Sequence, residues 1–222
     1  MIHRVAGFPD LLAFRFAGST NAACWPRTLP GNFDEVVRAL GPGEGLVALD
    51  EVRLRGLDVS AGGRAAIDVM LADLALLREA GRDPVLNIIY GYPRDDSGEA
   101  VATDVFSWHA DRAPIEADTW LCTYAGAASE GLPAGEASRK VDDPRIRAEL
   151  LALFGGLDDA AFAEWLAENS YDLHYVPAPG AVPYGFGRHN LWRIACDWPG
   201  SPVPPCVHRA PETDAPRLLV IC

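Results

Sequence analysis

Apolar residues recur at three- and four-residue spacing in one stretch of the N-terminal half. This spacing places them on one face of a helix. Gly81 lies where the C-terminal cap of such a helix is expected. We therefore predict a helix over residues 62–82 whose apolar stripe packs on a sheet. The members of the stripe are Ile67, Met70, Leu71, Leu74 and Leu77.

A shorter helix and a strand are predicted before this long helix. Asn32 can cap a helix that has Asp34 and Glu35 in its first turn and ends near Leu40. Residues 45–57 begin as an apolar run and then alternate between apolar and polar positions, which is typical of a strand. The first 30 residues are mixed and interrupted by Pro and Gly, and they predict no clear element.

The pattern changes at Pro84 to short β-branched and aromatic runs bounded by Pro, Gly and Asp. A helical insert interrupts these strands. Asp143 caps its first helix, and a second helix, capped by Asp158, runs through Glu168. We expect this insert, at about residues 143–169, to act as a lid or buttress. The predicted antiparallel strands are 85–92, 105–109, 119–125, 191–196, 205–208 and 218–221.

These elements predict an α+β protein with a double-stranded β-helix, or jelly-roll, core. We expect a single domain over residues 1–222, since one hydrophobic core is usual at this length. Residues 1–83 would supply N-terminal helices and the first strands, and residues 84–222 the metal-binding core with its late insert. Inward-facing side chains converge at the mouth of such a barrel, where metals and small ligands bind.

Three residues in the predicted core have the chemistry of a metal site. His109 and Asp111 are two positions apart, so on an extended strand both side chains point to the same face. His208 adds a second imidazole. Two histidines and one carboxylate occupy one face of an octahedral iron(II) and leave three positions open. Arg217, nine residues after His208, offers a forked and permanently charged partner for a carboxylate.

This arrangement resembles the iron(II)/2-oxoglutarate-dependent oxygenase superfamily, whose members share a His-x-Asp, a distant His and a basic residue about ten positions beyond it. The resemblance spans roughly residues 85–222. Residues 86–93 are similar to an Asn-Tyr-Tyr-Pro strand of some of these enzymes, in which the Tyr before Pro helps to hold 2-oxoglutarate, so the resemblance implies that role for Tyr92. Those enzymes usually have Arg-x-Ser, whereas this chain reads Arg217-Leu218-Leu219. The overall layout is also similar to an uncharacterised bacterial family.

The resemblance implies an oxidoreductase that binds Fe(II) and 2-oxoglutarate and hydroxylates, or otherwise oxidises, a small molecule or peptide. Two alternatives stay open. One is a cupin-like hydrolase or isomerase in which zinc or manganese acts as a Lewis acid. The other is a metal- or ligand-binding protein without catalysis, which the absence of the Arg-x-Ser pair suggests.

Composition limits which partners the protein could bind and in which cell compartment we expect it. A formal net charge of −12 opposes binding to a phosphate backbone, so we expect no nucleic-acid partner. No apolar stretch approaches the length of a membrane span and no leader pattern begins the chain, so we expect no membrane partner and a cytoplasmic protein. The five cysteines are scattered and never form C-x-x-C, which argues against a disulfide framework and a zinc ribbon.

Two further histidines lie in a segment rich in Tyr, Pro and Gly between the insert and the last strands. For His174 and His189 we expect ordinary solvent exposure, although a binding-loop role is the alternative.

Overall fold

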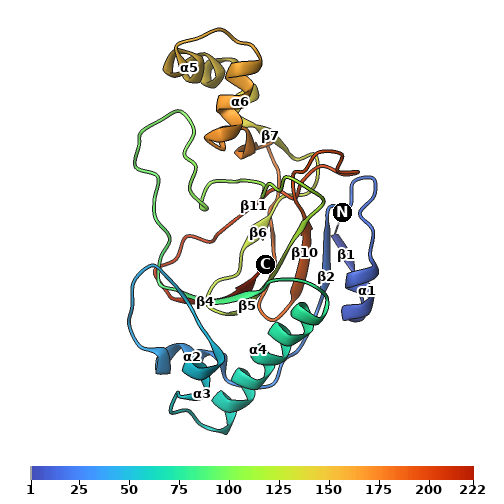
Figure 1. Cartoon of the computed structure of the whole chain (residues 1–222), viewed down its shortest axis with the longest axis vertical. Coiled ribbons are helices and arrows are strands. Elements are labelled where there is room, and N and C mark those ends of the chain that lie inside the picture. The colour runs from blue at the N-terminus through green and yellow to red at the C-terminus, as the bar shows by residue number, and fades with distance from the viewer. Residues whose placement is uncertain (1) are drawn as a thin grey trace.

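A seven-stranded mixed sheet lies at the centre of the computed structural model, which describes residues 2–222 (Figure 1). The strand order is β1-β2-β10-β5-β12-β4-β3. The first pair, β1 and β2, is parallel, and every other neighbouring pair is antiparallel. The sheet is open, with β1 and β3 as its edges. Its strands are β1 (Ile2–Arg4), β2 (Ala22–Trp25), β3 (Leu46–Ala48), β4 (Val85–Ile89), β5 (Asp118–Ala125), β10 (Leu191–Ala195) and β12 (Arg217–Ile221).

Two smaller sheets complete the strands. The first has the order β11-β6-β9, and the second pairs β7 with β8. His109 extends the first of these sheets, because its backbone forms an antiparallel bridge with His208 at the start of β11. The strands are β6 (Glu130–Gly131), β7 (Ala137–Arg139), β8 (Tyr175–Pro177), β9 (Tyr184–Gly185) and β11 (His208–Arg209).

The helices fall into an N-terminal group and a late pair. In Figure 1 the longest helix, α4, lies beside the central sheet, whereas α5 and α6 lie together at one end of the molecule. No helix within residues 2–222 has the length and apolar character needed to cross a bilayer. The helices are α1 (Phe8–Ala13), α2 (Phe33–Leu40), α3 (Glu51–Arg55), α4 (Ala61–Glu79), α5 (Pro144–Phe154) and α6 (Ala160–Glu168), with short 3₁₀ turns η1 (Lys140–Asp142) and η2 (Tyr171–Leu173).

Alternation along the central strands gives the sheet two different faces. On β5, Trp120, Cys122 and Tyr124 belong to the large hydrophobic cluster that includes the stripe of α4. The intervening Leu121 belongs to a second cluster on the opposite face. Because side chains of a strand alternate with a period of two, helices cover one face and the other face is left for the small sheet and the candidate site.

A buried polar network fixes α4 to the sheet. Arg27, which follows β2, donates from Nη1 and Nη2 to the two carboxylate oxygens of Asp73 on α4, over 2.7 and 2.9 Å. The Tyr124 hydroxyl on β5 donates to Oδ2 of the same carboxylate over 2.6 Å. The Arg27 and Asp73 side chains are only 5% and 8% exposed. Each therefore needs the other as a counter-charge.

The predicted N-terminal helices agree with the structure, and the predicted strand between them agrees only in part. The 62–82 helix is confirmed as α4, and the Asn32 side chain caps α2 by accepting from the Glu35 amide. The expected strand over 45–57 ends at Ala48. Asp50 then accepts a hydrogen bond from the Arg53 amide, which begins α3 instead. The first 30 residues, for which no element was predicted, supply β1, α1 and β2.

In the second half, three strand predictions are wrong wholly or in part. The strand predicted over 85–92 ends at Ile89. Residues 105–109 form no strand, because the Asp104 carboxylate accepts from the amides of Phe106 and Ser107 and turns the chain there. The strand predicted over 205–208 is β11, which begins only at His208. The helix predicted to start at Asp158 is capped by Asp159 instead, since the Asp158 carboxylate pairs with Arg147.

The helical insert has a small hydrophobic core of its own. Phe162 and Leu166 on α6 pack with Leu150 on α5 and with Val101 from the loop before the predicted metal ligands. The Tyr171 hydroxyl also donates to the Glu99 carboxylate in that loop. The insert is therefore tied to the segment that leads into His109.

The Arg27–Asp73 pair gives a stability prediction. Asp73→Ala leaves a buried guanidinium without its counter-charge, so the free energy of unfolding should fall by about 3–5 kcal/mol. The control is Asp68→Ala on the same helix, where a 63% exposed side chain pairs with Arg55 and a change under about 0.5 kcal/mol is expected. Urea denaturation of the three proteins measures both values. Equal losses for the two variants would show that the buried network does not stabilise the fold.

Candidate metal centre

Three side chains from two distant segments meet on the sheet face that the helices leave free. His109 and Asp111 come from the segment before β5, and His208 begins β11. One potential ligand atom from each residue lies within 4.8 Å of the other two. His208 Nε2 is 3.7 Å from Asp111 Oδ2, and the two imidazole centroids are 4.6 Å apart. The structure thus brings the three predicted ligands together as a group that can hold a metal ion.

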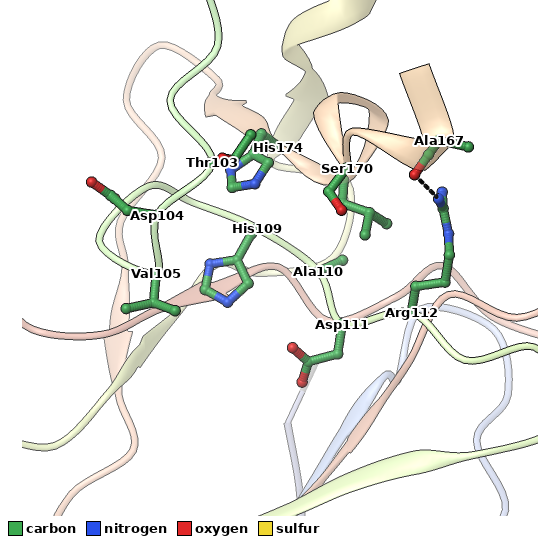
Figure 2. A pocket seen from close by; sticks show the side chains of 11 residues that line it. Thr103, Asp104, Val105, His109, Ala110, Asp111, Arg112, Ala167, Ser170 and His174 are labelled. Carbon is green, nitrogen blue, oxygen red and sulfur yellow. Dashed lines mark hydrogen bonds between the residues drawn. The ribbon is translucent and has the colours of Figure 1, made fainter. Parts of the chain in front are cut away.

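The backbone explains why the two histidines meet. The His109 amide donates to the His208 carbonyl over 2.9 Å, and the His208 amide donates back over 2.8 Å. A residue pair that exchanges both hydrogen bonds has its side chains on the same face of the sheet. Asp111 lies two residues further along, and Figure 2 shows its carboxylate beside the His109 ring.

Each imidazole is oriented by a hydrogen bond at Nδ1, the ring nitrogen that does not face the metal position. His109 Nδ1 lies 2.8 Å from the Ser107 carbonyl, and His208 Nδ1 lies 3.1 Å from the Cys206 carbonyl. A carbonyl oxygen only accepts, so Nδ1 carries the proton and the lone pair of Nε2 is left for a metal. Burial and the nearby His208 also lower the pKa of His109 to about 4, which keeps this ring neutral at pH 7.

The Asp111 carboxylate is held by the Thr119 hydroxyl, which also contacts a thiol. Thr119 on β5 donates from Oγ1 to Asp111 Oδ2 over 2.5 Å. The same Oγ1 lies 3.3 Å from Cys196 Sγ. Burial raises the pKa of Asp111, but His208 and the Thr119 hydroxyl outweigh it, so the pKa lies below its ordinary value. The carboxylate is therefore ionised and its orientation is fixed before a metal binds.

Arg217 is a buried cation that has only neutral partners. It is 2% exposed, and it donates from Nε to the Ala127 carbonyl, from Nη1 to the Tyr92 hydroxyl and from Nη2 to the Ser129 hydroxyl, over 2.7, 3.2 and 3.0 Å. Among residues 2–222, no carboxylate forms an ion pair with it. These bonds use three of the five N–H donors of a guanidinium. Burial without a counter-charge lowers the pKa of Arg217 from its ordinary value.

A cavity of about 160 Å³ joins the metal group to the partners of Arg217. His109, Asp111 and His208 line it, and so do Tyr92 and Ser129, which bond to the guanidinium. Much of the remaining wall is apolar and comes from the sheet face opposite α4. That part of the wall includes Ile89, Leu121 and Leu219. A small molecule in this cavity would therefore lie near the metal group and near the two hydroxyls that contact Arg217.

A second and larger cavity, of about 400 Å³, also touches the metal group. It shares Val105, His109 and Asp111 with the first cavity, and its other lining residues, among them Ser170 and His174, are different (Figure 2). The expectation of an exposed His174 is wrong, because this residue is 3% exposed. His189 is half-buried and packs against Phe33, with the ring centroids 4.8 Å apart.

Two residues of the site, Thr119 and Ser129, were not predicted from the sequence, and for His174 a binding role was only the alternative to exposure. Ser129 and His174 reach the site through contacts between distant segments, whereas Thr119 contacts Asp111 eight residues before it. Thr119 shares the face of Leu121 on β5, so a correct strand register would have pointed to it. Nothing in the local sequence around Ser129 signals its contact with Arg217.

Comparisons with known proteins found no matching family model, no matching curated protein and no matching solved structure. The chemical interpretation of the site therefore depends on the residues that form it.

The Thr119 hydroxyl gives a prediction for metal affinity. Thr119→Val keeps the shape of the side chain and removes the donor to Asp111, so zinc affinity should fall about 10- to 100-fold. Thr119→Ser keeps the hydroxyl and should stay close to the wild type. Competition with a chromophoric chelator measures all three affinities. Wild-type affinity in the valine variant would show that Asp111 needs no support from Thr119.

Proposed function

We propose that this protein is an iron(II)/2-oxoglutarate-dependent oxygenase. The observation that carries the proposal is the buried Arg217 guanidinium, which has no carboxylate partner among residues 2–222. It contacts Tyr92 and Ser129, and these two residues line a cavity together with the His-Asp-His group. A small cavity lined by a metal group and by the hydroxyl partners of an unpaired cation suits a molecule that carries both a chelating group and a carboxylate. 2-Oxoglutarate has both.

The energetics of Arg217 favour an anionic ligand. An isolated charge is costly to remove from water unless it is paired. The two N–H donors that Arg217 does not use within the chain match the two oxygens of a carboxylate. The Tyr92 and Ser129 hydroxyls hold the guanidinium in place before the ligand arrives. Arg217 would therefore bind and orient the far carboxylate of the acid.

The donor set also fits iron. Two neutral imidazoles and one carboxylate on one side of an ion are the ligands of non-haem iron(II) oxygenases, with three positions left open. When bound, iron would supply the activation of dioxygen. His109 and His208 would present Nε2 to it, and Asp111 would offset part of its charge. The apolar side chains of Leu121 and Leu219 would limit the access of water to the acid.

Ser129 supplies the hydroxyl that the family pattern would place elsewhere in the sequence. The usual Arg-x-Ser would put a serine at position 219, which here is a buried leucine that lines the cavity. Ser129 supplies a hydroxyl from a different segment, and it lies 3.0 Å from Arg217 Nη2. A hydroxyl is thus present beside the guanidinium without the Arg-x-Ser motif.

The strand pairing supports a double-stranded β-helix for residues 85–221. In chain order, β4 pairs with β12, His109 with β11, β5 with β10 and β6 with β9. The first segment thus pairs with the last, the second with the last but one, and so on inwards. This nested order is the one expected of an eight-stranded jelly roll, with the single bridge at His109 in place of one strand. Strands β1, β2 and β3 would be additions to the larger sheet.

The two alternative functions explain fewer features of the site. A zinc or manganese hydrolase, or a protein that only binds a metal, accounts for the His-Asp-His group. Neither accounts for a buried cation with two unused donors beside the same cavity.

Anaerobic titration with iron(II) and 2-oxoglutarate tests the proposal. Chelation of the iron by the acid should give a weak visible charge-transfer band in the wild type. Arg217→Ala removes a charge-assisted contact worth up to about 3 kcal/mol, so the affinity for the acid should fall on the order of a hundredfold while iron binding is retained. The control is Arg209→Ala, in which a 33% exposed arginine paired with Glu130 is removed and the band should persist.

Two outcomes would overturn the proposal. Iron binding without any band in the wild type would exclude 2-oxoglutarate as the co-substrate. Equal affinities of the wild type and Arg217→Ala for the acid would show that Arg217 does not bind its carboxylate.

A further inference from the structure

The larger cavity has its own recognition groups beside the metal centre. It encloses about 400 Å³ and includes His109 and Asp111 in its wall, so a molecule inside it would lie next to the metal. Tyr92, Ser129 and His208, which line the smaller cavity, are absent from its wall. A ligand of this cavity is therefore recognised by different side chains from those that would hold 2-oxoglutarate.

His174 is the most informative residue in this wall. Its backbone forms a bridge with His109, and the two rings lie with their centroids 5.9 Å apart. The ring is buried, yet no residue among 2–222 forms a hydrogen bond with its Nδ1. A buried polar atom without a partner costs about 1–3 kcal/mol. A catalytic role, or a water or ligand that completes its hydrogen bonding, explains such an atom in other proteins.

Ser170 lines the same cavity and has an uncommon backbone conformation. Its φ is 61°, one of two positive values among the non-glycine residues described. Such conformations are disfavoured for side chains other than glycine, and they cluster at binding and active sites. In Figure 2, Ser170 and His174 both lie above the space next to His109 and Asp111.

The arginine in the wall of this cavity, Arg112, is already paired. Arg112 forms ion pairs with Asp172 and Asp197. The Asp104 carboxylate accepts from the backbone amides of Asp95, Phe106 and Ser107. No arginine or lysine of this wall is therefore left to balance an anionic ligand. The smaller cavity differs, because an unpaired guanidinium lies beside it.

We propose that the larger cavity binds the molecule that is oxidised, and that it recognises an uncharged polar group, such as a carboxamide or a hydroxyl, through His174. That the bound molecule is oxidised rests on the proposed function, whereas its binding in this cavity does not. An imidazole has one donor and one acceptor when neutral, which suits an amide or a hydroxyl. An anionic group would lose its hydration here without gaining a counter-charge, and a cationic group would be repelled by a metal ion bound beside it.

Three probes of similar size and different charge test the charge preference. Propionamide, propionate and propylammonium are titrated into zinc-loaded protein labelled with ¹⁵N-histidine, and the ring signal of His174 is identified by its loss in His174→Phe. Propionamide should shift this signal the most. A larger shift with propionate or with propylammonium would overturn the proposal, as would the absence of any shift with propionamide.

The phenylalanine variant tests the role of His174 itself. His174→Phe keeps a ring and removes both nitrogens, so propionamide affinity should fall about fivefold, the equivalent of one neutral hydrogen bond. Zinc affinity should not change. The control is the exposed His3 in His3→Gln, which should leave propionamide affinity unchanged. Equal propionamide affinity in the wild type and His174→Phe would overturn the assignment of His174. Because zinc replaces iron and no oxidation is measured, this result is independent of the absorption band that tests the proposed function.

Discussion

Two backbone hydrogen bonds between His109 and His208 are the constraint on which the candidate site depends. They join the segment before β5 to the start of β11 and place both imidazoles on one face. Asp111 reaches the same space only because it lies two residues after His109. Neither segment belongs to a long strand, so neighbouring structure must hold the bridge. The Leu132 amide, which donates to the Val207 carbonyl, anchors the adjoining strand on the other side of His208.

The second requirement is the alternation of the central strands. Because every other residue of β5 and β12 faces the helices, the residues between them face the small sheet. This arrangement puts Thr119 behind Asp111 and Arg217 beside the cavity. A one-residue shift in the register of β12 would place Arg217 on the helix face and leave the cavity without its cation. The buried Arg27–Asp73–Tyr124 network fixes the helix side of the same strands.

The parts of the fold that follow from local rules could be predicted from the sequence. Side-chain caps at Asn32 and Asp143 and the stripe of α4 act within one or two turns of chain, and each appears where expected. The His109, Asp111 and His208 group was found because its spacing matches a known ligand set. Thr119, Ser129 and His174 could not be found in this way. Their roles arise from the register of strands and from contacts between distant segments, which composition and periodicity do not encode.

Metal content is the most direct test of the central claim that His109, Asp111 and His208 hold one metal ion. Wild-type protein, His109→Ala and Asp111→Ala are loaded with iron(II) under anaerobic conditions, freed of excess metal and assayed by elemental analysis, with circular dichroism to verify that each is folded. The wild type should retain about one ion per chain, and each variant should lose most of it, since removing a ligand from a metal site lowers its affinity steeply. Stoichiometric metal in both folded variants would contradict the account.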